Sequence, residues 1–101
     1  MRAMVIADED TVLGFRFAGV EGRVVESRSE AARAFEEAVR MPDLGLVILT
    51  ERIAGGIRAA VDRQRFEASV PLVVEVPGPE GPPEDRRTML DMIREAVGVS
   101  I

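Results

Sequence analysis

The chain has 101 residues, 47% of them hydrophobic and 31% charged, which is the composition of one ordinary globular domain. Eighteen acidic residues against thirteen basic ones give a net charge of −5, which argues against a large nucleic-acid interface. The sequence contains no His, Cys or Lys, so disulfides, thiolate and imidazole chemistry, Schiff bases and zinc sites built on Cys or His are excluded. We therefore expect a protein that is not an enzyme and that uses no cofactor.

Short apolar runs alternate with helix-like segments along the first half of the chain. A strand is predicted at residues 3–7, and the acidic residues after it suit the start of a helix over residues 10–18. A second strand is predicted near residues 23–26. Ser29 is then expected to cap a helix that closes before Pro42.

The second half of the chain begins with the most apolar segment, residues 44–49, which is predicted to be a strand covered on both faces. Thr50 follows as the cap of a third helix, whose inner face is expected to consist of Ile53, Ile57, Ala60 and Val61. A fourth strand is predicted at residues 72–76. The last helix is predicted at residues 84–97.

This alternation predicts an α/β fold with a four-stranded parallel sheet and helices on both faces, a Rossmann-like or receiver-like three-layer sandwich. The first and third strands are the most continuously apolar, so they should be central and the strand order should be 2-1-3-4. We expect a Rossmann-like region at 1–76, a Pro/Gly connector at 77–83, and a C-terminal helix and tail at 84–101. Together these parts are expected to form a single structural domain.

The acidic residues after the first strand raise the possibility of a phosphoacceptor receiver domain. Asp8, Glu9 and Asp10 supply carboxylates that could hold Mg²⁺, although acids at a helix N-terminus are also common and stabilising. A receiver needs an aspartate at the end of the third strand, where this chain has Thr50, and a later lysine, which it lacks. We therefore expect neither phosphotransfer nor a metal site.

Two segments are candidates for contact with a partner protein. In the predicted last helix, the apolar positions cover a wide arc and serve either a broad core face or an outside helix: Met89, Met92, Ile93, Ala96 and Val97. In the first helix, Arg16 lies between two phenylalanines, Phe15 and Phe17. Arg16 is either simply solvated or pairs with an acidic partner surface.

Four segments, in the same order and spacing, make the chain resemble the small F subunit of V-type and archaeal A-type rotary ATPases. The acidic turn at residues 8–10 leads into Phe15-Arg16 and Gly19, as in that family's opening signature. Residues 46–51 are similar to its third strand and following cap. Val76-Pro77 with Gly81 is similar to its Pro/Gly loop, and residues 93–101 are similar to its ending.

The resemblance implies a non-catalytic central-stalk subunit of a proton- or sodium-translocating rotary ATPase. Such a subunit binds the coiled-coil D subunit of the rotor shaft, has a mobile C-terminal helix and modulates ATP hydrolysis or synthesis. Phe15, Arg16 and the apolar positions of the last helix are the expected contacts. The sequence shows no targeting signal and no span of ~20 apolar residues, so a cytoplasmic location peripheral to the membrane is expected. A degenerate receiver-like signalling domain that acts through protein contact is the alternative.

Overall fold

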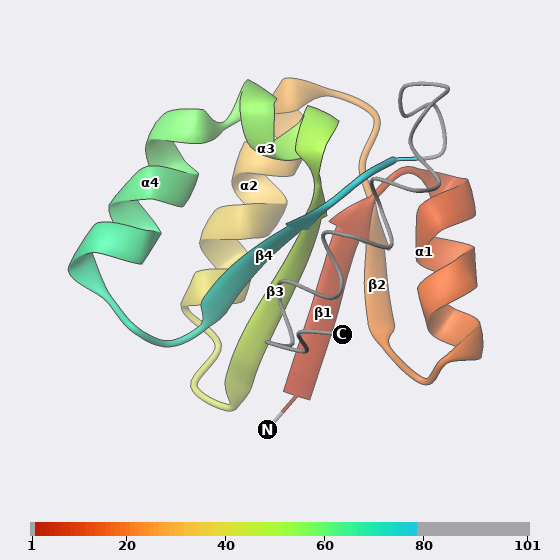
Figure 1. Ribbon diagram of the computed structural model, residues 1–101, viewed down its shortest axis with the longest axis horizontal. Helices are drawn as coiled ribbons and strands as arrows, with labels where there is room; N and C mark the ends of the chain where they lie inside the picture. The colour runs from red at the N-terminus through yellow and green to blue at the C-terminus, as the bar shows by residue number, and fades with distance from the viewer. Residues whose placement is uncertain (1, 79–101) are drawn as a thin grey trace, which may run out of the picture.

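The structure, a computed structural model, describes residues 2–78 and shows one sheet of four parallel strands in the order β2-β1-β3-β4 (Figure 1). The strands are β1 (Arg2–Ala7), β2 (Glu21–Val24), β3 (Leu44–Thr50) and β4 (Leu72–Val76). The helices are α1 (Glu9–Phe17), α2 (Arg28–Val39), α3 (Glu51–Gly56) and α4 (Arg58–Glu67). The predicted fold class and strand order are confirmed. The predicted helix at 84–97 lies outside the described residues.

The two central strands carry the buried apolar residues that the sequence pattern assigned to them. β1 pairs with β3 over most of its length, with Met4 opposite Val47 and Ile6 opposite Leu49. Leu49 and Ile6 have no accessible surface, as expected for strands covered on both faces. The outer strands β2 and β4 each pair on one side only.

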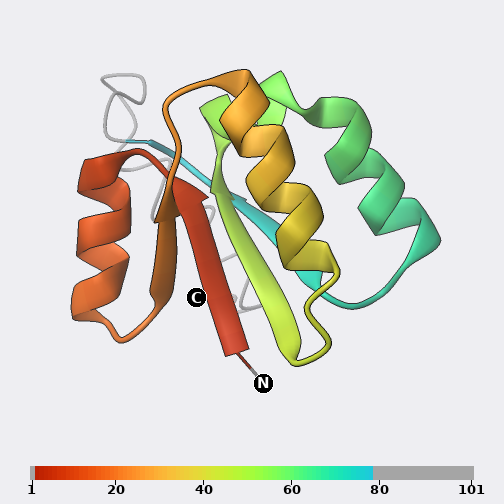
Figure 2. The ribbon, with the colours of Figure 1, turned by 180° about the vertical axis from the view of Figure 1, so that it is seen from behind.

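The larger core lies between the sheet and the helices α2, α3 and α4, which share one face. Figure 2 shows α2 on the near side of the sheet next to β3, with α4 beside it on the same side. Within residues 2–78, Phe35 of α2 is the largest fully buried side chain, and burying a side chain of this size contributes about 1.5–3 kcal/mol. The other residues of this core include Met4, Ile6, Ala31, Ala34, Ala38, Leu44, Val47, Leu49, Ala54, Ile57, Val61 and Val73.

A smaller core lies on the opposite face, where α1 packs against β1 and β2. Val12 of α1 is 1% exposed and packs with Val5, Ala7 and Ile48. Gly22 of β2 makes this packing possible, because a Cβ at that position would lie well inside van der Waals contact with the Val12 side chain. A glycine in a strand here marks a close approach between a helix and the sheet.

The second strand and the second helix begin earlier than predicted. β2 covers Glu21–Val24 instead of 23–26, because its parallel register with β1 ends where Val24 lies opposite Ala7. The helix α2 is capped by Ser27 rather than Ser29. The Ser27 hydroxyl accepts a hydrogen bond from the Glu30 amide at 3.1 Å, and the Glu30 carboxylate accepts one from the Glu26 amide at 2.6 Å. These two bonds satisfy the backbone donor of Glu30 in the first helical turn and that of Glu26 just before the cap.

The predicted third helix is two helices, α3 and α4. Ile57 interrupts the helical path with φ −126° and ψ 36° and is only 7% exposed, within the larger core. Two glycines, Gly55 and Gly56, directly precede the break and weaken helical continuity. The inner residues named from sequence still face the sheet, since Val61 is buried and Ala60 and Ile53 pack against the same core.

Side chains of α4 hold the outer edge of β4. Arg58 donates two hydrogen bonds to the Glu75 carboxylate, at 2.6 and 2.9 Å, and Arg65 donates to the same carboxylate at 3.0 Å. Arg65 also donates to the Val73 carbonyl at 3.1 Å, and Gln64 donates to the Pro71 carbonyl at 3.2 Å. The hydrogen bond from Arg58 is the main reason that the pKa of Glu75 is lowered. These contacts occupy edge carbonyls that another strand could otherwise pair with.

Candidate functional site

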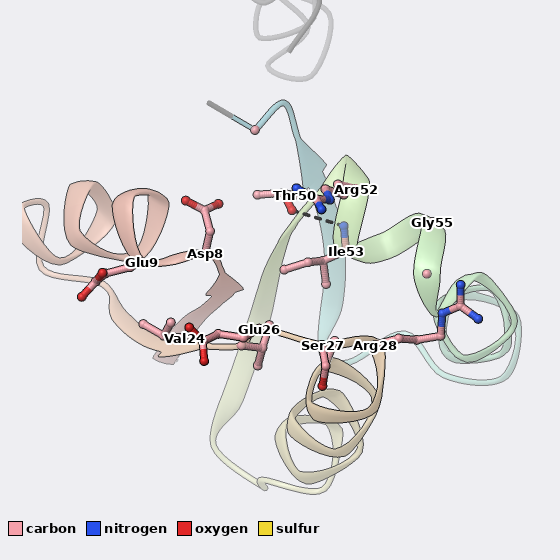
Figure 3. A pocket seen from close by; sticks show the side chains of 14 residues that line it. Asp8, Glu9, Val24, Glu26, Ser27, Arg28, Thr50, Arg52, Ile53 and Gly55 are labelled. Atoms are coloured by element: carbon pink, nitrogen blue, oxygen red, sulfur yellow. Dashed lines mark hydrogen bonds between the residues drawn. The ribbon is translucent and has the colours of Figure 1, made fainter. Parts of the chain in front are cut away.

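A crevice of about 940 Å³ opens at the carboxyl ends of the strands (Figure 3). It lies beside β1 and β3, where the strand order reverses, which is the usual ligand position in open α/β sheets. Its lining combines acidic and basic side chains: Asp8, Glu9, Glu26, Arg28 and Arg52. Carboxylates in the lining repel a polyphosphate, whereas typical phosphate sites present backbone N–H groups at a helix N-terminus.

Asp8, the first candidate metal ligand, acts as the cap of α1. One of its carboxylate oxygens accepts a hydrogen bond from the Thr11 amide at 3.1 Å, and the other accepts one from the Thr11 hydroxyl at 2.7 Å. Burial acts to raise the pKa of Asp8, but the hydrogen bonds from Thr11 and from the backbone amides of Asp8 and Asp10 together outweigh it, and the pKa lies below its usual value. Both oxygens therefore have a structural role in the local fold.

Thr50 occupies the end of β3, where a receiver would carry its phosphoacceptor. It is 2% exposed, and its hydroxyl accepts a hydrogen bond from the Ile53 amide at 3.3 Å as the cap of α3. Figure 3 shows this bond beside the crevice. Within residues 2–78, no group of three or more carboxylate, His or Cys side chains is arranged to hold a metal ion. Asp8, Glu9 and Asp10 thus do not converge into a Mg²⁺ site.

The sequence-predicted contacts Phe15 and Arg16 occupy different environments on α1. Phe15 is half-buried and packs against the smaller core beside Val12. Arg16 is exposed in the last turn of the helix, where a cation is favourable beside the helix dipole. Arg16 is therefore accessible to a partner, whereas part of the Phe15 ring already belongs to the fold.

Sequence reasoning missed two other side chains on α1 that point to solvent. Phe17 is 84% exposed and Leu13 is 47% exposed, one helical turn apart. The signal was present in the sequence, since a helix that buries Val12 and Phe15 turns positions 13 and 17 away from the sheet.

A second exposed apolar group lies near the start of β4. Phe66, at the end of α4, is 92% exposed, and Val70 and Leu72 are more than half exposed. The remaining sequence-predicted contacts, Met89, Met92, Ile93, Ala96 and Val97, lie outside the described residues. Across residues 2–78, no helix is long and apolar enough to cross a membrane.

Comparison with known proteins gives a consistent result over nearly the whole chain. The family model described as ATP synthase (F/14-kDa) subunit matches residues 3–96. The F subunit of the A-type ATP synthase of Methanococcus maripaludis is 40% identical over 103 aligned positions, covering 100% of this chain and 99% of that protein. The corresponding protein of Methanothermobacter thermautotrophicus is 34% identical over 99 positions, covering 96% of this chain and 92% of the relative.

A solved structure shares the fold as well as the sequence. The crystal structure of the V-type ATP synthase F subunit of Archaeoglobus fulgidus superposes with a TM-score of 0.61 at 28% identity, covering 74% of this chain and 95% of that one. The chain belongs to the F-subunit family of A-type and V-type ATP synthases.

Proposed function

We propose that this chain is a non-catalytic central-stalk subunit that binds the coiled-coil D subunit of the rotor shaft. Through that contact it modulates the coupling between ATP hydrolysis or synthesis and ion transport. The observation that carries the proposal is the match to F subunits of A-type ATP synthases over the full length of the chain. Peripheral association with the membrane then follows from assembly into the complex.

The chemistry of the described residues supports a role in binding rather than catalysis. Asp8 and Thr50, the two residues at the positions that phosphotransfer would need, are engaged in capping hydrogen bonds. The sequence offers no His, Cys or Lys to act as base or nucleophile. What α1 exposes instead is an apolar and charged surface suited to protein contact.

The partner contacts are proposed to include Arg16 and the exposed part of Phe15, together with Met89, Met92, Ile93, Ala96 and Val97 of the predicted last helix. Apolar area that becomes buried on binding contributes about 25 cal/mol per Å², before the costs of association. A carboxylate introduced among these positions should therefore weaken binding to the D subunit strongly.

The test compares wild type with Met92→Asp for thermal stability and for binding to the purified D subunit. Arg87→Asp is the matched control, because it places the same carboxylate on the polar side of the same predicted helix. The proposal predicts lost binding for Met92→Asp with an unchanged melting temperature, and retained binding for Arg87→Asp. If wild type does not bind the D subunit, the proposed function is wrong. If Met92→Asp binds normally, the contact is made elsewhere on the chain.

A further inference from the structure

The outer face of α1 combines an exposed apolar pair with a helical glycine that the fold does not require. Phe17 and Leu13 lie one turn apart and are 84% and 47% exposed. Gly14 lies beside them, and a Cβ added there would meet no atom within 4 Å. A glycine in a helix interior destabilises the helix relative to alanine, and packing within the described residues gives no reason for it.

The absence of a side chain at Gly14 leaves a notch beside the row formed by Leu13 and Phe17. Ridges formed by residues four positions apart pack into the grooves of a facing helix, and a glycine beside the ridge lets the two backbones approach closely. Gly22 gives the contrasting case on the inner side of α1, since a Cβ there would overlap Val12. The fold explains Gly22 on the inner side of α1, whereas a helix that docks from outside would explain Gly14 on the outer side.

Charged residues at the two ends of the outer face of α1 indicate which charges a complementary partner helix would carry. Glu9 and Asp10 lie in the first turn of α1, and Arg16 lies in its last turn. Among residues 2–78, the side chains of these three residues form no ion pair, whereas Arg2, Arg23, Arg58 and Arg65 do. A helix with basic residues opposite Glu9 and Asp10 and an acidic residue opposite Arg16 therefore matches the face in one orientation.

We propose that the outer face of α1, defined by Leu13, Gly14 and Phe17, is a docking surface for one helix of the shaft's coiled coil. The inference rests on the proposed function, because the coiled-coil D subunit is the helical partner which that function supplies. The inference goes beyond the proposed function because it assigns the contact to α1 and makes the fit depend on the notch at Gly14. It also specifies that the partner helix carries basic residues opposite the start of α1.

Two pairs of matched variants in the full chain test the proposal, with binding to the purified D subunit and the melting temperature as readouts. Phe17→Ala should weaken binding by at least about tenfold, because an exposed aromatic anchor is lost. Phe66→Ala removes an equally exposed phenylalanine from the other end of the domain and should leave binding within about twofold. Equal binding by these two variants would overturn the proposal.

The glycine variants give a signature that a general loss of folding cannot produce. Gly14→Ala should raise the melting temperature, because alanine favours the helix, and should weaken binding, because its methyl group fills the notch. Gly55→Ala changes another exposed helical glycine with open space around it, so it should raise the melting temperature without affecting binding. Full binding by Gly14→Ala contradicts the notch. Failure of wild type to bind the D subunit overturns the proposed function, and this inference with it.

Discussion

Gly22→Ala tests whether the packing of α1 against the sheet depends on the absence of one methyl group. The new Cβ would overlap the Val12 side chain and lie 3.2 Å from a methyl carbon of Val5. Optimal carbon–carbon contacts are about 3.5–4.0 Å, and both neighbours are buried, so one of them or the helix itself must shift. Overpacking of this kind costs about 1–3 kcal/mol.

Part of that cost is offset in the unfolded state, because alanine has less conformational freedom there than glycine. The offset is about 0.4–1 kcal/mol where the backbone suits alanine, and Gly22 does not have the positive φ found at Gly19. The expected net destabilisation is therefore between about 0 and 2.6 kcal/mol, with a midpoint of about 1.3 kcal/mol. For a domain of this size, each kcal/mol lowers the melting temperature by about 4–8 °C.

The assay is denaturant unfolding of four chains: wild type, Gly22→Ala, Val12→Ala and the double variant. Because Val12→Ala removes the overlapping methyl groups, Gly22→Ala should cost less than about 0.5 kcal/mol in that background. Gly55→Ala is the control for alanine at a glycine with open space around it, and it should stabilise the chain. A Gly22→Ala variant more stable than wild type, or additive effects of the two substitutions in the double variant, would refute the proposed packing.

Two further predictions concern Glu75 and Asp8. Glu75→Gln should lower the free energy of unfolding by about 1 kcal/mol near neutral pH, because Arg58 and Arg65 lose an ionised partner. Because the pKa of Glu75 is lowered in the folded state, its contribution to stability is present above the unfolded pKa and is lost as the pH falls through the folded pKa. The difference in melting temperature between wild type and Glu75→Gln should therefore shrink as the pH falls below about 4. A difference in melting temperature that stays constant from about pH 2 to 7 would contradict the lowered pKa. Acetyl phosphate should label neither wild type nor Asp8→Asn, and labelling that disappears in Asp8→Asn would show phosphotransfer at this position.

Apolar patterning was sufficient to predict the sheet. The continuous run at 44–49 identified a strand covered on both faces, and the order 2-1-3-4 followed from placing the two most apolar strands in the centre. The position of β2 was wrong because a strand of four residues has almost no periodic signal of its own. Its position is set by pairing with β1 and by the space that Val12 needs above Gly22.

Three local features were not predicted from the sequence: the cap residue of α2, the break at Ile57 and the surroundings of Asp8. Ser27 and Ser29 both resemble helix caps. The bond from the Glu30 amide to the Ser27 hydroxyl, and the bond from the Glu26 amide to the Glu30 carboxylate, favour Ser27. The burial of Ile57 was predicted correctly, but the prediction carried one helix through Gly55 and Gly56, whose conformational freedom weakens helical continuity just before the break at Ile57. At the candidate site, the sequence pattern located the acidic turn. It did not predict that the Thr11 hydroxyl donates a hydrogen bond to the Asp8 carboxylate.

The most direct test of the rotor assignment measures ATP hydrolysis by the catalytic head assembled with the D subunit, as this chain is added. A non-catalytic stalk subunit predicts a change in the hydrolysis rate that saturates at one chain per D subunit, while the chain alone hydrolyses no ATP. Phe66→Ala should reproduce the wild-type titration. A rate that does not respond to the chain, although the chain binds the D subunit, or hydrolysis by the isolated chain, would contradict the assignment.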